Sequence, residues 1–549
     1  MKLLLSMLSL LIGVLTFGQT SFSPEKIKLL DSIATQDVPL NAPGIATAII
    51  QDGRVVYEKY AGYADLTDSS LINKTTRFNI ASNGKQFTAL AVLSLIDEKK
   101  LKLSDDVRKY YPTLFPKIKE KITIQSLLNH TSGIRDCYDL WSLQGYTWWE
   151  KSFSNADVLK LIKKQEDLNF KPNTKYLYSN TNYILLALIV EKVSGKSFVE
   201  FTNAMFRKLN MPNTSFESDY TKIRGQIARA YFNFGTWTTY DWIWKVCGDG
   251  NIFSTLEDQI QWEKVVQGKG FTKFKKKIIA ESQQPIAGSA FRKYGYGLEF
   301  GQYKGMDYVF HEGATGAWKA TVIRFTSKKL TFITLTNTGK SIPSIQTRQM
   351  ADIVFDLKPD EAYLVTTPAK VGKFVSDDEI VGTYLTDSDF AFQFEKRDGK
   401  MFLKRVGRND VELEREADNI YHQKFDPPFK QEFTTTANGD LQVTAYYVNH
   451  SPYSLTKQKA DFSNFNFESL NGNFINTETG TTLSISYKTN TTYDIKIANN
   501  DYTSTGLLIT PQKLLVDNYT LTFAPDNFKI PTVYLSGDRV KGIKFVRED

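Results

Sequence analysis

The sequence predicts an α+β domain followed by all-β modules, and three observations lead to this fold class. Apolar strand patterns occur at both ends of the segment 19–360 and enclose a helix-rich middle. A helical pattern follows the last of these strands, so this helix can pack on a sheet built from both ends of the segment. Beyond about residue 371, short alternating strands and polar turns replace helical periodicity.

The N-terminal residues have the pattern of a secretory signal. A positive Lys2 precedes the apolar run Leu3–Phe17, and Gly18-Gln19 follows it. This run is too short for a membrane-spanning helix, which needs roughly twenty apolar residues. We expect residues 1–18 to be a signal peptide and the mature chain to be periplasmic or secreted in a bacterium, without stable membrane insertion. An uncleaved membrane anchor is the alternative.

The next elements are justified by their periodicity. Glu25–Ala34 has helical spacing, and the two strands that follow it are joined by Asp52-Gly53, a strong hairpin signal. A helix-rich middle extends from about residue 82 to 263. The expected strands are Ile45–Gln51, Val55–Ala61, Tyr308–His311, Trp318–Phe325 and Leu330–Thr336, and a final helix is expected at Ile345–Leu357. These elements define one expected domain, residues 19–360.

The composition changes near Lys358-Pro359, and we expect a linker at 361–372. The tail contains two similar openings, Gly382-Thr-Tyr384 and Gly472-Asn-Phe474. We therefore expect two β-rich modules, residues 373–460 and 465–549. A single larger barrel is the alternative.

The composition excludes several function classes. A hydrophobic content of 41% and a charged content of 23% are typical of a globular protein. The net charge of +8 is spread along the chain, so we expect no nucleic-acid partner. The four histidines show no ligand spacing and there are two cysteines, so no metal site and no cofactor are expected. Cys137 and Cys247 either form a disulfide, which export permits, or remain two buried thiols.

Nucleophilic catalysis remains, and its first candidate is Ser82-Asn-Gly-Lys85 at the start of an apolar helix. Residues three apart share a helix face, so the Ser82 hydroxyl and the Lys85 amine can converge. A buried lysine loses hydration and its pKa falls, so it can accept the serine proton near neutral pH. The same spacing recurs at Ser23–Lys26 and Ser454–Lys457, but only the Ser82 copy precedes a long apolar helix.

Two further elements carry candidate residues. Tyr178-Ser-Asn180 precedes the apolar helix 184–193, where the phenol could relay protons and the amide could bind a substrate carbonyl. His311-Glu-Gly-Ala-Thr-Gly316 ends a strand, and its glycines permit a close backbone approach. Taken singly, each of these has an ordinary structural explanation, since Tyr-x-Asn occurs elsewhere in the chain and a lone histidine is usually a packed residue.

Together these elements resemble the serine beta-lactamase and penicillin-binding family, specifically its class C-like branch of D-stereospecific peptidases and esterases. The resemblance covers about residues 25–357 and depends on several motifs that occur in the family's order. They are Pro43-Gly44-Ile45, Phe78-Asn-Ile-Ala-Ser82, Leu101-Lys-Leu-Ser-Asp105, Ile124-Gln-Ser-Leu-Leu-Asn-His-Thr-Ser-Gly133, Tyr178-Ser-Asn180, Gly248-Asp-Gly250 with Ser254-Thr255, Tyr294-Gly-Tyr-Gly297 and His311-Glu-Gly313.

The resemblance implies an antiparallel sheet of five or more strands beside an all-helical subdomain, with the site between them. It also implies roles for individual residues. Ser82 is expected to be acylated, Lys85 to manage its proton and Tyr178 to act as the base. The implied substrate-binding residues are Asn180, His311, Gly313 and Ala314, with the N–H groups of Ser82 and Ala314 forming the oxyanion hole. His130 is expected to be scaffold.

The sequence departs from the family pattern at two positions. Many relatives have Lys-Thr-Gly where this chain has His311-Glu-Gly313, and a mostly neutral histidine weakens the expected capture of a substrate carboxylate. Pro172-Asn173 replaces the usual Pro-Gly, which Asn tolerates in a left-handed turn. Aromatic residues in two stretches are expected to rim the cleft, or alternatively to pack among loops: Trp141, Tyr146, Trp148, Trp149, Tyr231, Phe232, Phe234, Trp237, Tyr240, Trp242 and Trp244.

The expected function is hydrolysis of an amide or ester through an acyl-enzyme on Ser82. The expected partners are D-amino-acid peptides, small esters or, secondarily, beta-lactams. The alternative is a catalytically silent sensor of cell-wall fragments or peptides with the same fold.

Overall fold

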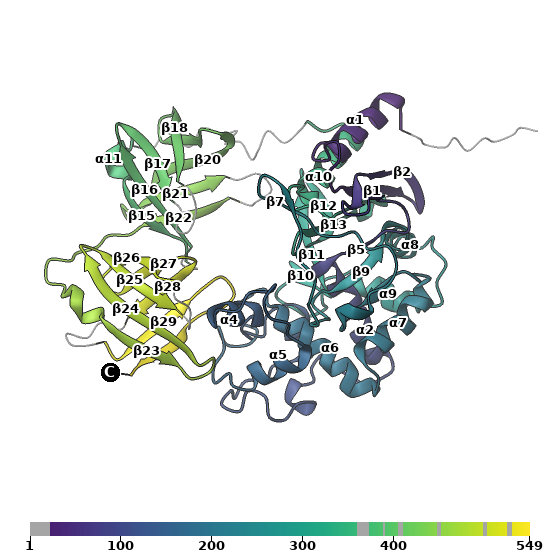
Figure 1. The fold of residues 1–549 in the computed structure, drawn as a ribbon, viewed down its shortest axis with the longest axis horizontal. Helices are drawn as coiled ribbons and strands as arrows, with labels where there is room; N and C mark the ends of the chain where they lie inside the picture. Colours follow the sequence, from purple (N-terminus) through teal and green to yellow (C-terminus); the bar gives the residue numbers. More distant parts are fainter. Residues whose placement is uncertain are drawn as a thin grey trace, which may run out of the picture.

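The computed structural model describes residues 22–358, 373–387, 390–404, 410–446, 452–497, 502–523 and 530–548. The expected signal peptide (1–18) and linker (361–372) lie outside the described residues. Figure 1 shows an α+β domain beside two β-barrels, which confirms the predicted fold class. Within the described ranges, every helix is too short or too polar to cross a lipid bilayer.

A seven-stranded antiparallel sheet organises the first domain. Its order is β10-β11-β12-β13-β14-β1-β2, so the two N-terminal strands join the strands from the end of the domain, as predicted. Asp52 and Gly53 both adopt positive φ in the tight β1–β2 turn, which is the backbone geometry that an Asp-Gly hairpin favours. The bounds are β10 Tyr294–Gly295, β11 Leu298–Tyr303, β12 Met306–Thr315, β13 Trp318–Phe325, β14 Leu330–Thr336, β1 Ile45–Gln51 and β2 Arg54–Ala61.

Two layers of helices cover the sheet. α1 (Pro24–Thr35) and α10 (Pro343–Val354) pack together on one face, where Leu30 and Met350 share a core with Phe332. The opposite face packs on the helical subdomain, and Ala46, Ala48 and Ile50 point into that core. The remaining helices of the domain are α2 Lys85–Asp97, α3 Ile124–Leu128, α4 Cys137–Leu143, α5 Asn155–Ile162, α6 Asn180–Ser194, α7 Phe198–Leu209, α8 Leu256–Val266 and α9 Lys276–Ser282.

Helices α2 and α6 form the centre of the helical subdomain. Both helices are apolar on all sides, because other helices surround them. The middle of the domain also contains short strands that the periodicity did not indicate: β3 Tyr63–Asp65, β4 Ser70–Leu71, β5 Arg77–Asn79, β6 Ser215–Phe216, β7 Phe232–Asn233, β8 Trp237–Thr238 and β9 Ile252–Thr255. Cys137 and Cys247 are both buried and free, so the disulfide alternative does not apply.

The tail forms two closed barrels, each with its strands antiparallel in chain order. The first also carries α11 (Asp377–Ile380) and contains β15 Gly382–Leu385, β16 Ala391–Arg397, β17 Lys400–Lys404, β18 Val411–Ala417, β19 Ile420–Gln423, β20 Asp426–Thr435, β21 Leu441–Tyr446 and β22 Tyr453–Lys457. The second contains β23 Gly472–Asn476, β24 Thr481–Thr489, β25 Thr492–Ile497, β26 Ser504–Thr510, β27 Lys513–Val516, β28 Tyr519–Phe523, β29 Thr532–Ser536 and β30 Ile543–Arg547.

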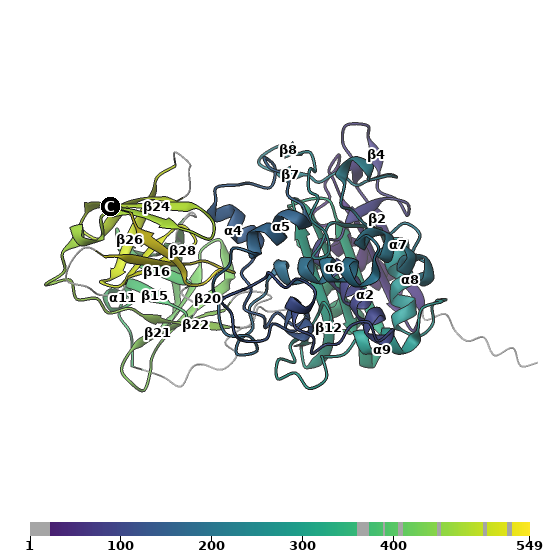
Figure 2. The same ribbon diagram turned by 90° about the horizontal axis from the view of Figure 1, so that it is seen from below.

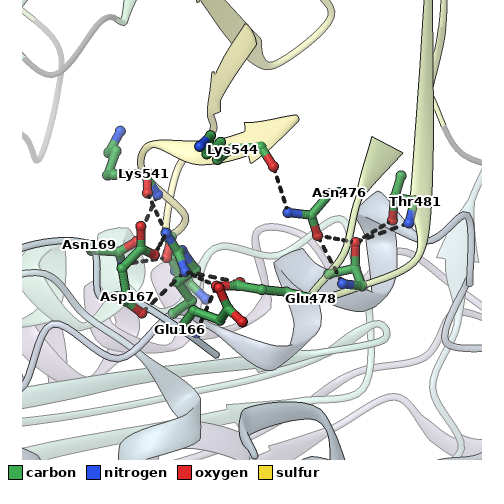
Figure 3. A network of polar contacts seen from close by, with 11 residues as sticks. Glu166, Asp167, Asn169, Asn476, Glu478, Thr481, Lys541 and Lys544 are labelled. Atoms are coloured by element: carbon green, nitrogen blue, oxygen red, sulfur yellow. Dashed lines mark hydrogen bonds and ion pairs between the residues drawn. The ribbon is translucent and has the colours of Figure 1, made fainter. Parts of the chain in front are cut away.

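The second barrel docks on the helical subdomain, as Figures 1 and 2 show near α4. Its interior belongs to the same hydrophobic core cluster as α2 and α6, whereas the first barrel has a separate core. Polar contacts close the interface (Figure 3): Glu478 accepts a hydrogen bond from the Glu166 backbone at 2.9 Å, and the Lys541 backbone donates to Asn169 at 2.7 Å. The barrel thereby packs against the side of the domain that carries α4.

Candidate active site

A cleft of about 970 Å³ lies where the sheet, the helical subdomain and the second barrel meet. Six of the seven residues proposed from the sequence line this cleft. The seventh, Lys85, lies directly beneath the cleft and is hydrogen-bonded to Ser82. The residues that line the cleft include Ser82, Tyr138, Trp141, Tyr146, Trp148, Trp149, Tyr178, Asn180, Trp242, Trp244, Asp249, Glu299, His311, Glu312, Gly313, Ala314, Lys319 and Arg539.

Ser82 lies on a short 3-10 turn, Ala81–Gly84, directly before α2. The preceding Ala81 has φ 48°, a left-handed conformation that a non-glycine residue rarely adopts. The Asn79 side chain accepts a hydrogen bond from the Ala81 backbone at 2.9 Å and so holds this conformation. Such local strain is common where a backbone presents a reactive group.

Strand β12 passes very close to the nucleophile, and Gly313 makes this approach feasible. A β-carbon at Gly313 would lie 2.3 Å from the Ile80 carbonyl oxygen and 3.0 Å from the Ser82 backbone nitrogen. Neither distance leaves room for a side chain. Ala314, the next residue, is exposed on the cleft wall.

Lys85 is fully buried below Ser82. Its ammonium donates to the Ser82 hydroxyl at 3.0 Å, to Asn180 Oδ1 at 2.9 Å and to the Asp249 carbonyl at 2.6 Å. Burial lowers the pKa of Lys85 to about 8, although Asp249 opposes the shift. Near neutral pH this amine is therefore much closer to its titration point than an exposed lysine.

The Tyr178 phenol also reaches the nucleophile. Its hydrogen bond with Ser82 lowers the pKa of the phenol, but burial raises this pKa by more and keeps it well above its ordinary value. The ring lies 5.0 Å from the Lys85 ammonium, measured to the ring centre, and packs on the His130 ring with the centres 4.3 Å apart and the planes tilted by 32°. Tyr178 is consequently a neutral phenol at physiological pH.

Asn180 is the first residue of α6 and is held from two sides. Its Oδ1 accepts from Lys85, while its Nδ2 donates to the Asp136 carboxylate at 3.0 Å. Asp136 also accepts from the Asn180 backbone at 2.6 Å and caps α4 through the Tyr138 backbone. The amide thus links the lysine to the start of α4.

Both ring nitrogens of His311 are engaged within the protein. Nδ1 donates to the Glu312 carbonyl oxygen at 2.6 Å, so Nε2 accepts from the Tyr294 hydroxyl at 3.0 Å. Burial, followed by the charge of Lys85, lowers the pKa of His311 to about 3. His311 is neutral and provides no positive charge for a substrate.

Three lining residues were not singled out from the sequence. Asp249 accepts from the Tyr138 hydroxyl at 2.8 Å, and burial raises the pKa of its carboxyl; its place between Gly248 and Gly250 was the available signal. Burial, then Glu312, raises the pKa of Glu299 to about 7. Arg539 comes from the second barrel, and nothing local in the sequence indicates its role.

The aromatic rim is only partly as expected. Trp141, Tyr146, Trp148 and Trp149 from the first stretch line the cleft. From the second stretch only Trp242 and Trp244 do so. Tyr231, Phe232, Phe234, Trp237 and Tyr240 do not line it, because β7 and β8 fold into a separate hairpin; Phe232 and Tyr240 pack behind Trp148.

The chain belongs to the Beta-lactamase family, whose model matches residues 30–355, more than half of the chain. This match confirms the family that the sequence motifs indicated. In the described residues no cluster of three or more His, Cys, Asp or Glu side chains could hold a metal ion.

The chain is similar to several curated proteins. It is 37% identical over 198 residues to protein flp of Staphylococcus aureus, which covers 35% of this chain and 39% of that protein. It is 27% identical to the D-aminopeptidase of Brucella anthropi, covering 54% and 56%, and 27% identical to penicillin-binding protein 4* of Bacillus subtilis, covering 66% and 84%. The chain thus spans about two fifths of the length of flp.

A solved structure shows the same fold. The octameric penicillin-binding protein homologue from Pyrococcus abyssi matches with a TM-score of 0.56 at 23% identity, covering 78% of this chain and 99% of that one. The fold likeness extends past the α+β domain into the β-rich tail, since the α+β domain alone accounts for less than 78% of the chain.

Proposed function

We propose that this protein is an exported hydrolase that cleaves an amide or ester through an acyl-enzyme on Ser82. The observation that carries the proposal is the fully buried Lys85 ammonium, 3.0 Å from the Ser82 hydroxyl, with a pKa of about 8. A serine hydroxyl becomes an effective nucleophile when an adjacent base accepts its proton. Export rests on the N-terminal pattern alone.

In the acylation step, the neutral amine of Lys85 takes the Ser82 proton while Oγ attacks the substrate carbonyl. The N–H groups of Ser82 and Ala314 stabilise the oxyanion, and the close passage of β12 brings them to one side of the carbonyl. The raised pKa of Tyr178 favours a neutral phenol, so Tyr178 hands a proton to the leaving group and regains one from Lys85.

In the deacylation step, the roles reverse. Lys85, neutral again, draws a proton through Tyr178 from a water molecule that attacks the acyl group. The oxyanion collapses, and Ser82 leaves with a proton from Lys85. Asn180 holds the amine in place and presents its amide to the substrate.

The substrate class proposed is small peptides with D-amino acids, together with small acyl esters. The similarity to a D-aminopeptidase supports the D-amino-acid peptides. The aromatic rim supports an apolar acyl group in both the peptides and the esters. True beta-lactam hydrolysis is a secondary candidate, since His311 adds no positive charge for the carboxylate of such a ligand.

A labelled fluorophosphonate followed by peptide mapping tests the proposal. We expect one modified residue, Ser82, and loss of labelling and of p-nitrophenyl ester hydrolysis in Ser82→Ala. Ser454→Ala is the matched control, because Ser454 and Lys457 have the same spacing on strand β22 of the first barrel, where Ser454 is exposed. Full esterase activity in Ser82→Ala, or labelling elsewhere, would refute the mechanism; ligand binding without covalent capture would favour the sensor.

A further inference from the structure

The loop between β29 and β30 of the second barrel brings Arg539 into the cleft wall. The loop is a tight turn, with a 2.7 Å hydrogen bond from the Gly537 backbone to the Val540 carbonyl, and Val540 is fully buried. The side chain of Arg539 is 35% exposed. Its guanidinium lies 5.1 Å from the centre of the Tyr178 ring, so one phenol ring separates it from the nucleophile.

The backbone of this loop is held in place by the hydrolase domain. The Arg539 N–H donates to Asp139 at 2.8 Å, and its carbonyl accepts from Asn169 Nδ2 at 3.0 Å and from the Asp136 N–H at 3.3 Å. These bonds use main-chain atoms of Arg539, so they fix its backbone and leave the donors of the guanidinium available. A residue whose backbone is already fixed loses less entropy when it binds a ligand.

The guanidinium has a weak partner within the described part of the chain. Its Nε lies 3.6 Å from the Asp538 carboxylate, which is 83% exposed, and such exposed pairs contribute little. Asp136 is occupied by Asn180 and by the Tyr138 backbone. Among the described residues, neither Asp136 nor Asp139 forms an ion pair with this guanidinium within 4.0 Å, but the charges of both, together with Asp538, outweigh burial and raise the pKa of Arg539.

Among the described residues that line the cleft, Arg539 is the cation whose side-chain donors remain available. Lys319 is the second cationic lining residue, but its ammonium already donates to the carbonyls of Gly339 and Ser341 at 2.8 and 2.9 Å. Lys85 is buried beneath Ser82 and donates to three acceptors. His311, which stands where many relatives carry the lysine of Lys-Thr-Gly, has both nitrogens engaged.

We propose that Arg539 binds a free carboxylate on the leaving-group side of the substrate, so that the second barrel supplies a specificity-determining residue to the Ser82 site. The position over Tyr178, the phenol assigned to leaving-group protonation, places the guanidinium on that side. A guanidinium binds carboxylates with two parallel hydrogen bonds. The preferred substrates are then acyl esters or peptides whose departing portion ends in a carboxylate. This inference rests on the proposed function.

The test compares benzoyl-D-alanyl-thioglycolate with its methyl ester, which lacks the charge, in otherwise identical assays. We expect the wild-type kcat/KM ratio of acid to methyl ester to fall at least about tenfold in Arg539→Gln, and Arg539→Lys to restore part of it. Arg397→Gln on the first barrel is the control and should leave the ratio unchanged. Thermal unfolding of each variant checks that the barrel remains docked.

The outcomes separate the two proposals. An unchanged ratio in Arg539→Gln, with Ser82 still labelled by fluorophosphonate, overturns the role of Arg539 and leaves the hydrolase mechanism standing. Equal losses on both thioesters also overturn it, since they indicate a structural effect. Absence of both labelling and thioester hydrolysis in the wild-type protein overturns the proposed function and this inference with it.

Discussion

The Lys85 ammonium and the Ser82 hydroxyl lie 3.0 Å apart across one turn of chain, and the lysine side chain has no contact with solvent. This pair combines the two properties that a serine nucleophile requires from its base, contact and a lowered proton affinity. Asn180 and the Asp249 carbonyl accept hydrogen bonds from the ammonium and stabilise the charged form, so they limit how far the pKa of Lys85 falls.

The pH dependence of activity should follow Lys85. Its pKa is lowered from the ordinary lysine value to about 8, so the neutral, proton-accepting form increases as the pH rises through that value. We expect kcat/KM for a neutral p-nitrophenyl ester to rise toward pH 8 and to level off above it. An arginine at this position stays charged at every pH. We therefore expect Lys85→Arg to lower kcat/KM about a hundredfold or more and to abolish its rise toward pH 8. Lys457→Arg is the control; an intact rise in Lys85→Arg would assign the titration elsewhere.

Gly313 should tolerate no side chain. Because a β-carbon there would collide with the Ile80 carbonyl and crowd the Ser82 nitrogen, β12 would have to move away from the nucleophile. We expect Gly313→Ala to lower kcat by about a hundredfold, as a displacement of about 1 Å can do. A β-carbon added at Gly339 would have its nearest neighbours 3.8 Å away, so Gly339→Ala is the matched control. Comparable activity in both variants would contradict the close approach.

The aromatic rim should determine acyl-chain preference. Trp148 lines the cleft and packs on Trp242 at 6.2 Å between ring centres, whereas Trp237 does not line it. We expect Trp148→Ala to reduce the ratio of kcat/KM for octanoate over acetate p-nitrophenyl esters by about tenfold, since each buried methylene is worth about 0.8 kcal/mol. Trp237→Ala should leave the ratio unaltered. Equal ratios in all three proteins would show that the rim is packing alone.

The docking of the second barrel should depend on Arg135. This side chain is 1% exposed and pairs with Glu478 at 3.0 Å and with the more exposed Asp167. Arg135→Met leaves the Glu478 carboxylate buried without its cation, and we expect a loss of about 3–5 kcal/mol in the free energy of unfolding. Urea denaturation measures this loss, and limited proteolysis reports undocking.

Two further variants serve as controls for Arg135→Met. The double variant Arg135→Met with Glu478→Met should recover part of the lost stability, because no unpaired charge remains. Arg397→Met removes an exposed pair with Asp410 on the first barrel and should cost less than about 1 kcal/mol. A similar small cost for Arg135→Met would mean that apolar contacts alone dock the barrel.

Much of the sheet was predictable because its strands are continuous apolar runs. The expected bounds of β1, β13 and β14 coincide with the observed ones, and Asp52-Gly53 forms the expected turn. The two-residue strands were not predictable. Their pairing, such as that of β6 with β9, depends on segments brought together by the fold rather than on local alternation.

The grouping of the candidate residues was predictable where ordered motifs carry them. The seven proposed residues gather around one cleft, but His311 proved to be bound to Tyr294 and its own backbone neighbour, which no spacing reveals. The place of Arg539 in the cleft could not be predicted from the sequence, for a different reason. Its approach to Asp139 spans 400 residues of sequence, and a turn in a β-rich tail gives no sign of which surface it will meet.

The contact between Arg539 and Asp139 also has a consequence for the order in which the protein matures. A ribosome makes Ser82 early and this turn much later, so the nascent α+β domain has an open side where the turn will sit. With Arg539 in its proposed role, full substrate discrimination begins only after the second barrel has folded and docked. A chain cut between the two barrels would then keep Ser82 and lose the proposed selectivity.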